Sequence, residues 1–221
     1  ILMTGNVFAD NKRVKKPGQQ VSQNSKIEIK GKTHPWVSRG GIKLNKAISE
    51  FNLDCNSIIA LDIGASTGGF TDVLLTNGAS KIYAVDVGYG QLDWKLRQDE
   101  RVIVKEKTNA RYLTNEIIQD PLDALVCDAS FISLKKVLPS GLGFLKSHGW
   151  LVALIKPQFE VGKGLVGKGG VVKDHKLHEA VINNITKWIE FEIKMNVSGV
   201  IESPILGPSG NKEFLIVATK I

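Results

Sequence analysis

Glycines gather in the segment Asp62–Phe70, between an apolar stretch typical of a buried strand and a second one typical of a helix. Glycine lets the backbone turn tightly and come close to a ligand, and the start of a helix offers unpaired N–H groups. The carboxyl end of the first strand is also where open α/β sheets bind nucleotides. The D-x-G-x-x-x-G spacing of Asp62, Gly64 and Gly68 is typical of S-adenosylmethionine sites, whereas Ser66 breaks the G-x-G-x-x-G pattern of hydride-transfer enzymes.

An acidic residue at the end of the next predicted strand strengthens this interpretation. Asp86 closes that strand, and a carboxylate there can accept hydrogen bonds from both hydroxyls of a ribose. We therefore predict that S-adenosylmethionine is bound by Asp62, Gly64, Ala65, Ser66, Thr67, Gly68, Gly69, Phe70, Asp86, Val87, Asn109, Ala110 and Asp128. Asn109 and Ala110, just past the third strand, are expected near the adenine. The alternative is a glycine turn that binds no ligand.

Two lysines and two further carboxylates are predicted to meet at the same edge of the sheet. Asp128 and Lys156 each close a strand, Glu213 opens the last strand, and Lys43 lies in a helix that leads into the sheet. A charged residue at a buried strand end is costly unless it is paired, so we expect these four residues to pair with one another. The alternative for each residue taken alone is an ordinary ion pair at the sheet edge.

The elements that must position these residues follow from the hydrophobic pattern. Strands are predicted at 58–63, 81–87, 102–104, 122–127, 150–155, 197–201 and 214–219, and helices at 70–77, 93–98, 134–147 and 174–194, with one more running from Gly40-Gly41 to Phe51. Alternating strands and helices indicate a parallel sheet covered on both faces. Only residues 202–212 join the last two strands, so the final strand is predicted to be antiparallel. The expected fold is therefore α/β and Rossmann-like, with a small β-rich fragment at the N-terminus.

The positive charge of the chain is concentrated near its beginning. The net charge is +7, but the first 46 residues alone hold ten basic and two acidic residues, and the remainder is close to neutral. A basic segment beside a neutral body favours a polyanionic partner such as nucleic acid. The expected contacts are Lys12, Arg13, Lys15, Lys16 and Arg39. The alternative is a solvated basic tail.

Composition excludes several other classes of protein. The longest uninterrupted apolar run, Trp150–Ile155, is far shorter than the roughly 20 residues of a membrane helix, so we expect no stable membrane insertion. Two widely separated cysteines, Cys55 and Cys127, do not support a disulfide scaffold or a zinc cluster, and they fit the cytoplasm. We expect no bound metal. No signal segment is recognised, and the initial isoleucine predicts that the sequence is part of a longer chain.

Several short motifs follow one another between Pro35 and Ile221. They are Ser38-Arg39-Gly40-Gly41-Ile42-Lys43, Asp62–Phe70, Ala84–Leu92, Thr108–Arg111, Asp128–Ser133 and Lys156–Glu160. With these motifs the chain resembles the TlyA (haemolysin A) family, relatives of the FtsJ-like ribose 2′-O-methyltransferases. The resemblance implies a Rossmann-like methyltransferase fold, S-adenosylmethionine as the methyl donor, and a cytidine 2′-hydroxyl in ribosomal RNA, free or in ribosomal subunits, as the acceptor.

The same resemblance implies a catalytic Lys-Asp-Lys-Glu tetrad, which falls on Lys43, Asp128, Lys156 and Glu213. A ribose hydroxyl is a weak nucleophile that needs a base as the methyl group arrives in line. Lys156 is the candidate base, and Lys43 would supply positive charge or orient the hydroxyl. Asp128 and Glu213 would hold the two lysines in place.

Residues 1–33 resemble the second half of a small RNA-binding domain first seen in a ribosomal small-subunit protein. The resemblance rests on Gly5-Asn6-Val7, Lys16-Pro17-Gly18 and Ile27-Glu28-Ile29, and the helix pair that begins the family's domain is absent. The expected organisation is a partial RNA-binding domain at 1–33, a linker at 34–37 and a methyltransferase domain at 38–221. Two other functions stay open, a membrane-lytic haemolysin and an RNA-binding module whose methyltransferase fold is inactive.

Overall fold

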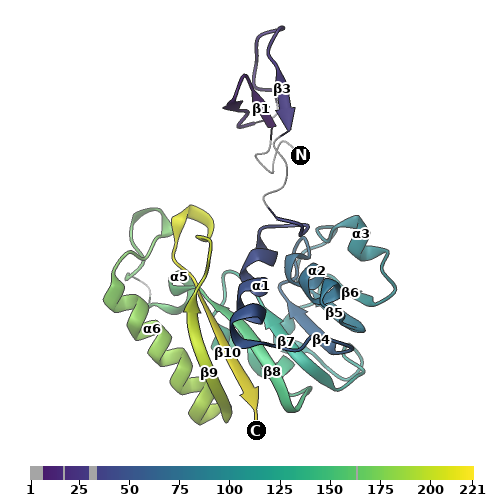
Figure 1. The fold of residues 1–221 in the computed structure, drawn as a ribbon. Coiled ribbons are helices and arrows are strands. Elements are labelled where there is room, and N and C mark those ends of the chain that lie inside the picture. The colour runs from purple at the N-terminus through teal and green to yellow at the C-terminus, as the bar shows by residue number, and fades with distance from the viewer. Residues whose placement is uncertain (1–6, 17, 30–33, 163) are drawn as a thin grey trace. The chain divides into compact units, whose positions relative to one another are not determined.

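The structure is a computed structural model that describes residues 7–16, 18–29, 34–162 and 164–221 (Figure 1). The chain divides into two compact units, Ile1–Pro35 and Trp36–Ile221. The division falls inside the predicted linker, 34–37, and Trp36 is already buried in the core of the second unit. Parts of the predicted N-terminal fragment, namely 1–6, Pro17 and 30–33, lie outside the described residues.

The first unit holds a three-stranded antiparallel sheet of β1 (Val7–Ala9), β2 (Lys12–Arg13) and β3 (Ile27–Ile29), in the order β2-β1-β3. Asp10 and Asn11 join β1 to β2, and both have positive φ angles, 49° and 64°. That backbone suits the twist of a tight hairpin, and Asp and Asn tolerate it better than most residues. The expected β-rich fragment is therefore confirmed.

The second unit is built on a seven-stranded sheet in the order β6-β5-β4-β7-β8-β10-β9. The strands are β4 (Ile59–Ile63), β5 (Lys81–Val85), β6 (Val102–Lys105), β7 (Leu122–Cys127), β8 (Leu145–Ile155), β9 (Met195–Glu202) and β10 (Phe214–Lys220). The strands from β6 to β8 run parallel, and β10 is antiparallel to both β8 and β9. The predicted parallel sheet with an antiparallel last strand is confirmed.

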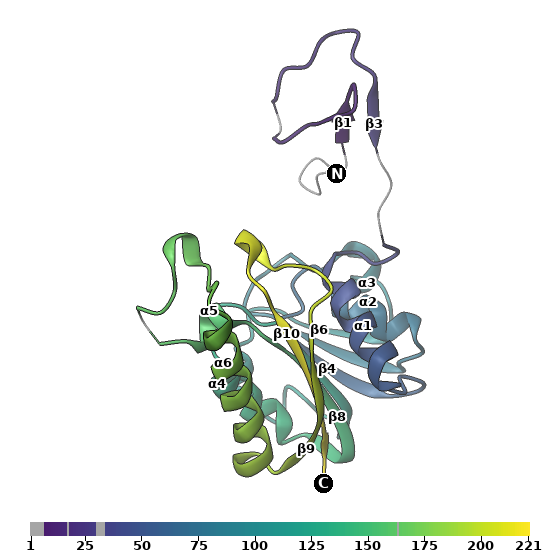
Figure 2. The same ribbon diagram turned by 60° about the vertical axis from the view of Figure 1, so that its left-hand side comes forward.

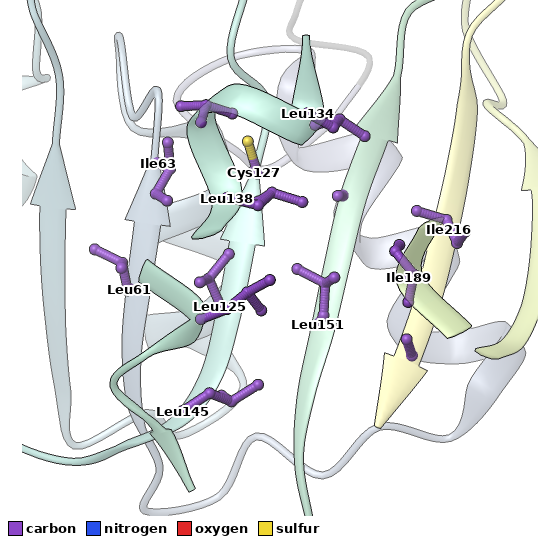
Figure 3. Packing of buried hydrophobic residues seen from close by; sticks show 14 of the residues in the cluster. Leu61, Ile63, Leu125, Cys127, Leu134, Leu138, Leu145, Leu151, Ile189 and Ile216 are labelled. Atoms are coloured by element: carbon purple, nitrogen blue, oxygen red, sulfur yellow. The ribbon is translucent and has the colours of Figure 1, made fainter. Parts of the chain in front are cut away.

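Helices cover both faces of this sheet (Figures 1 and 2). The helices are α1 (Gly40–Phe51), α2 (Gly69–Thr76), α3 (Trp94–Arg97), α4 (Leu134–Leu142), α5 (Pro157–Glu160) and α6 (His175–Lys187). Apolar residues of α1, α2 and α3 pack with one set of strand residues, whereas those of α4 and α6 pack with the other set. Figure 3 shows the second layer, in which Leu134 and Leu138 of α4 belong to the same cluster as Leu125 and Leu151 of the sheet.

The sequence prediction is wrong between residues 142 and 150. Helix α4 ends at Leu142 instead of residue 147, and β8 begins at Leu145 instead of residue 150. Leu145 pairs with Leu122, but the next pair along is Ala124 with Trp150, so the strand bulges between them. A bulge interrupts the two-residue alternation from which a strand is recognised. The predicted helix 174–194 also divides, into α6 and a π-helical turn, Trp188–Glu192.

Candidate active site

The glycine-rich turn between β4 and α2 brings two loops into close contact. Gly64 and Gly68 have φ angles of 79° and 93°, which favour glycine. A Cβ atom on Gly64 would lie 2.9 Å from the Cα atom of Ala129, in the loop after β7. Asp62 anchors the start of α2, because its Oδ2 accepts hydrogen bonds from the backbone N–H (3.0 Å) and the hydroxyl (2.7 Å) of Thr71.

A pocket of about 360 Å³ opens at the carboxyl ends of β4, β5 and β7. Of the predicted cofactor residues it is lined by Gly64, Ser66, Asp86, Val87, Asn109, Ala110 and Asp128. Sequence reasoning missed the other lining residues, namely Ile63, Val85, Gln91, Thr108, Ala129, Ser130, Phe131, Ile132 and Val137. Most of these lie within the motifs quoted above, so the motifs were the available signal. What the motifs do not tell is which of their side chains face the pocket.

Asp86 lies on the wall of this pocket with its carboxylate fixed by two backbone groups. Its Oδ2 accepts a hydrogen bond from the N–H of Ser66 at 2.8 Å, and its Oδ1 accepts one from the N–H of Gly88 at 2.7 Å. Each carboxylate oxygen keeps a second lone pair, so the group can still accept hydrogen bonds from a pair of ligand hydroxyls.

The residues present fit S-adenosylmethionine. Asp86 can hold the ribose, while Ala110, Ile132 and Val137 form an apolar part of the wall that suits the adenine ring. Gly64 and Ala129 both line the pocket. Because Gly64 has no side chain, only its backbone faces Ala129 there. A pocket with apolar walls and a few fixed polar groups is the usual form of a small-molecule site.

Replacing Asp86 by alanine is expected to weaken S-adenosylmethionine binding by about 1–3 kcal/mol, because two ligand hydroxyls would lose their acceptor. Isothermal titration of the wild-type and Asp86→Ala proteins measures the change. Asp99→Ala is a suitable control, because Asp99 pairs with Arg101 at 2.7 Å and does not line the pocket in the described part of the chain. Equal affinity of the Asp86→Ala and wild-type proteins would remove Asp86 from the site.

A second pocket, of about 300 Å³, adjoins the first. The two share Gly64, Ser66, Asp128 and Ser130. The second is also lined by the predicted cofactor residues Ala65, Thr67, Gly69 and Phe70, and by Arg39, Lys43 and Lys156. Within the described residues, Asp62 and Gly68 line neither pocket. Asp62 instead accepts a hydrogen bond from the first turn of helix α2. Gly68 is the N-cap residue of that helix and has a left-handed backbone conformation.

The four predicted tetrad residues form one chain of ion pairs, in which Lys43 and Lys156 line the second pocket and Asp128 lines both pockets. Nζ of Lys43 lies 2.7 Å from Oε2 of Glu213 and 3.4 Å from Oδ2 of Asp128. Nζ of Lys156 lies 2.6 Å from Oδ1 of Asp128. Lys43, Lys156 and Glu213 are only 7%, 6% and 1% exposed. Two positive and two negative charges therefore balance in a setting from which water is largely excluded.

Gly207, in the loop between β9 and β10, closes over Glu213. A Cβ atom on Gly207 would overlap the carboxylate of Glu213. Oε1 of Glu213 is buried and has no hydrogen-bond partner among the described residues, so its carboxylate depends on Lys43 for compensation. The sequence offered no signal for this contact, because it depends on how a loop folds back on its own strand.

Burial raises the pKa of Asp62 to about 7, and the nearby carboxylates of Asp128 and Asp86 add to the shift, while hydrogen bonds from Thr71 oppose it. The folded protein thus binds the Asp62 proton more tightly than the unfolded chain does. Stability from this group is complete below the ordinary aspartate pKa of about 3.9 and is lost as the pH rises through about 7.

We expect the free energy of unfolding of the wild-type protein to fall between pH 5 and pH 8 relative to that of an Asp62→Asn variant, whose amide does not titrate. Urea unfolding of both proteins at the two pH values measures the difference. If both proteins show the same pH dependence, Asp62 is already ionised at pH 5.

The predicted nucleic-acid contacts belong to both units. Lys12, Arg13, Lys15 and Lys16 are exposed in the first unit, and Lys12 and Arg13 form β2. Arg39 is exposed in the second unit, where it lines the pocket that contains Lys43 and Lys156. Of these five residues, only Arg39 belongs to the same unit as the tetrad, and it lines the same pocket as Lys43 and Lys156.

In the described residues, no helix has the length and apolar character needed to cross a membrane. The same part of the chain contains no group of three or more His, Cys, Asp or Glu residues placed to hold a metal ion.

Comparison with known proteins confirms the resemblance expected from the motifs. Residues 36–220 match the family described as "FtsJ-like methyltransferase". The chain is 45% identical over 216 residues to the "Putative rRNA methyltransferase YqxC" of Bacillus subtilis, and the matched segment covers 97% of this chain and 76% of that protein. It is 45% identical over 217 residues to the "16S/23S rRNA (cytidine-2'-O)-methyltransferase TlyA" of Mycobacterium tuberculosis, covering 98% of this chain and 81% of that protein.

A solved structure agrees with these relatives. The "Putative hemolysin from Streptococcus thermophilus" superposes with a TM-score of 0.85 at 43% sequence identity, covering 99% of this chain and 80% of that one. The similarity therefore extends over both units of the chain.

Proposed function

Because the chain belongs to the FtsJ-like methyltransferase family, we propose that it uses S-adenosylmethionine to methylate the 2′-hydroxyl of a cytidine in ribosomal RNA. The observation that carries this proposal is the ion-paired tetrad of Lys43, Asp128, Lys156 and Glu213, which is joined to both pockets through Asp128. One pocket fits the cofactor, and the other opens beside the lysines. Relatives that are 45% identical bear the name of this activity, which supports the choice of substrate.

In the proposed reaction, S-adenosylmethionine supplies a methyl group activated by its positively charged sulfur. Asp86, on the wall of the cofactor pocket, would hold the ribose of the cofactor. The target ribose enters the second pocket and places its 2′-hydroxyl near Lys156. Neutral Lys156 serves as the base for this hydroxyl as the oxygen attacks in line.

The other members of the tetrad prepare Lys156 and its surroundings for this step. Lys43 keeps a positive charge close to Asp128, and Glu213 holds Lys43 in place through the 2.7 Å contact. Asp128 lies between the lysines and orients the amine of Lys156. The carboxylate of Asp128 is therefore shared between the two lysines.

Neither alternative function has a comparable basis. The family match covers residues 36–220 as a methyltransferase domain, which leaves the haemolysin name of some relatives as a label. An inactive binding module would not need a complete tetrad next to a cofactor pocket.

Because the proposed substrate is ribosomal RNA, we place the protein in the cytoplasm, where that RNA is assembled into ribosomes.

The deciding experiment supplies purified protein with S-adenosylmethionine labelled in its methyl group and with ribosomal RNA. We expect the label in RNA, at one position or a few, and resistance of the adjoining phosphodiester bond to alkali, because a 2′-O-methyl group removes the internal nucleophile. An Asp128→Ala variant serves as the inactive control. Cofactor binding without any label in RNA would favour the inactive binding module instead.

We further propose that the exposed basic residues of the first unit supply RNA affinity and little catalysis. Contacts with phosphates release counterions, so the logarithm of affinity should fall with the logarithm of salt concentration by about 0.7 per contact on single strands. Reversing Lys12, Arg13, Lys15 and Lys16 together should flatten this slope, and filter binding at several salt concentrations measures it. Reversal of the similarly exposed Lys173, Lys176 and Lys187 is the control. An unchanged slope in the first variant would mean that its basic cluster is only solvated surface.

A further inference from the structure

Lys156 uses all of its hydrogen-bonding capacity within the protein. Its Nζ lies 2.6 Å from Oδ1 of Asp128, and it donates to the backbone carbonyl of Asp128 at 3.2 Å and to Oγ of Ser130 at 2.9 Å. A protonated lysine has three N–H donors and no acceptor. The three described partners therefore match the charged form of Lys156, which has no lone pair with which to receive a proton.

The neutral amine that a base requires also fits this site, but in only one way. A neutral amine keeps two N–H donors and gains one lone pair. The carboxylate and the carbonyl of Asp128 can only accept hydrogen bonds, so they retain the two N–H groups. Ser130 is the one partner of the three that can also donate. In the neutral state the lone pair of Lys156 must therefore receive the hydroxyl hydrogen of Ser130.

Ser130 also lies where the two reactants would meet. It lines both the cofactor pocket and the pocket beside the tetrad, and it is solvent-exposed. Lys156, by contrast, is 6% exposed and lines only the second pocket of the two. A hydroxyl that approaches the cofactor pocket can thus reach Oγ of Ser130 more readily than it can reach Nζ of Lys156.

We infer that Ser130 is a further catalytic residue, which relays the proton from the ribose 2′-hydroxyl to Lys156. The ribose O–H bond breaks as its proton passes to Oγ of Ser130, while the hydrogen of Ser130 passes to Nζ of Lys156. The electron pair of the ribose oxygen forms the new bond to the methyl group, and the pair of the broken S–C bond stays on sulfur. Lys156 becomes an ammonium and later releases its proton to water. This inference rests on the proposed function.

The first test measures the single-turnover rate of methyl transfer with saturating cofactor and RNA. Ser130→Ala should lower the rate constant by about 10²-fold, the lower end of the effect of a positioned proton-transfer group, and change S-adenosylmethionine affinity by less than about threefold. Ser130→Thr keeps the hydroxyl and should restore most of the rate. Ser133→Ala is the matched control, because that hydroxyl bonds to Oε2 of Glu160 at 2.7 Å instead of to Lys156. A Ser130→Ala enzyme with the wild-type rate constant would overturn the inference.

A second measurement separates a relay from a residue that merely holds Lys156 in place. The single-turnover rate of the wild-type enzyme is followed in mixtures of light and heavy water. Two protons in motion give a curved dependence on the deuterium fraction, and one proton gives a straight line. A straight line, or no dependence, would contradict the relay. If the wild-type protein does not methylate RNA at all, the proposed function is contradicted instead. Failure of the relay and failure of the proposed function therefore give different results.

Discussion

Lys156→Ala is expected to lower the rate of methyl transfer by about 10²–10⁴-fold, the usual contribution of a positioned base. Affinity for S-adenosylmethionine should stay within a few fold, because Lys156 lines the pocket beside the tetrad and is not among the residues that line the cofactor pocket. Single-turnover methylation and isothermal titration measure the two quantities. Loss of cofactor binding together with activity would show that the substitution damages the whole site.

The Lys156→Arg variant separates the role of a base from that of a charge. Arginine keeps its proton at any pH at which the enzyme is folded, so this variant should be nearly as slow as Lys156→Ala. The wild-type rate should rise with pH, since only the neutral amine can accept a proton. An active Lys156→Arg enzyme would mean that residue 156 acts by charge alone, and the base would then have to be sought at Asp128 or in a water molecule.

Lys43→Met is expected to destabilise the fold strongly. The substitution leaves the carboxylate of Glu213, which is 1% exposed, without its lysine at 2.7 Å. Removing one partner of a buried ion pair costs about 3–5 kcal/mol, because a buried charge is left uncompensated. The free energy of unfolding, measured in urea, should fall by that amount. Methyl transfer should also be lost at temperatures where the variant is still folded.

A double variant tests the electrostatic origin of this loss. Combining Lys43→Met with Glu213→Leu removes both charges, and replacement of a buried pair by apolar residues is often neutral or stabilising. Most of the stability should return while activity stays absent. Lys46→Ala is the matched control on the same helix. Lys46 pairs with Glu50, but the two side chains are 47% and 46% exposed, so their ion pair contributes less than about 1 kcal/mol. If the double variant is as unstable as Lys43→Met, the loss comes from packing.

The structure corrects the sequence prediction mainly where backbone geometry is irregular. Residues 145–149 carry the start of β8 through a bulge, with His148 at a φ angle of 65°. The three polar residues between Leu145 and Gly149 carry neither the two-residue period of a strand nor the wider period of a helix, so the sequence predicts that the helix runs on to residue 147. A local pattern cannot show that Leu145 finds its partner at Leu122, because that pairing is made between strands.

The sequence by itself determined the order of the strands in the large sheet's part of the chain, the glycine turn at Asp62–Phe70 and the positions of Asp128, Lys156 and Glu213 at the ends of apolar stretches, whereas the tetrad as a set was implied by the family resemblance. The strands, the turn and these three positions each leave a local mark, such as an apolar period, a fixed glycine spacing or a charge at the end of an apolar stretch. It also determined that the last strand is antiparallel, because the connection before it is too short for a crossover.

Only the tertiary structure decided which charges pair and which side chains face the pockets. Lys43 and Glu213 are 170 positions apart in the sequence, and nothing local to either one indicates that Gly207 closes over their contact. Ser130 is not among the predicted site residues, although it lies within the quoted motif Asp128–Ser133. Its significance comes from a single distance to Lys156 and from its place on two pockets. Such properties arise when distant strands are brought together, and a one-dimensional pattern does not contain them.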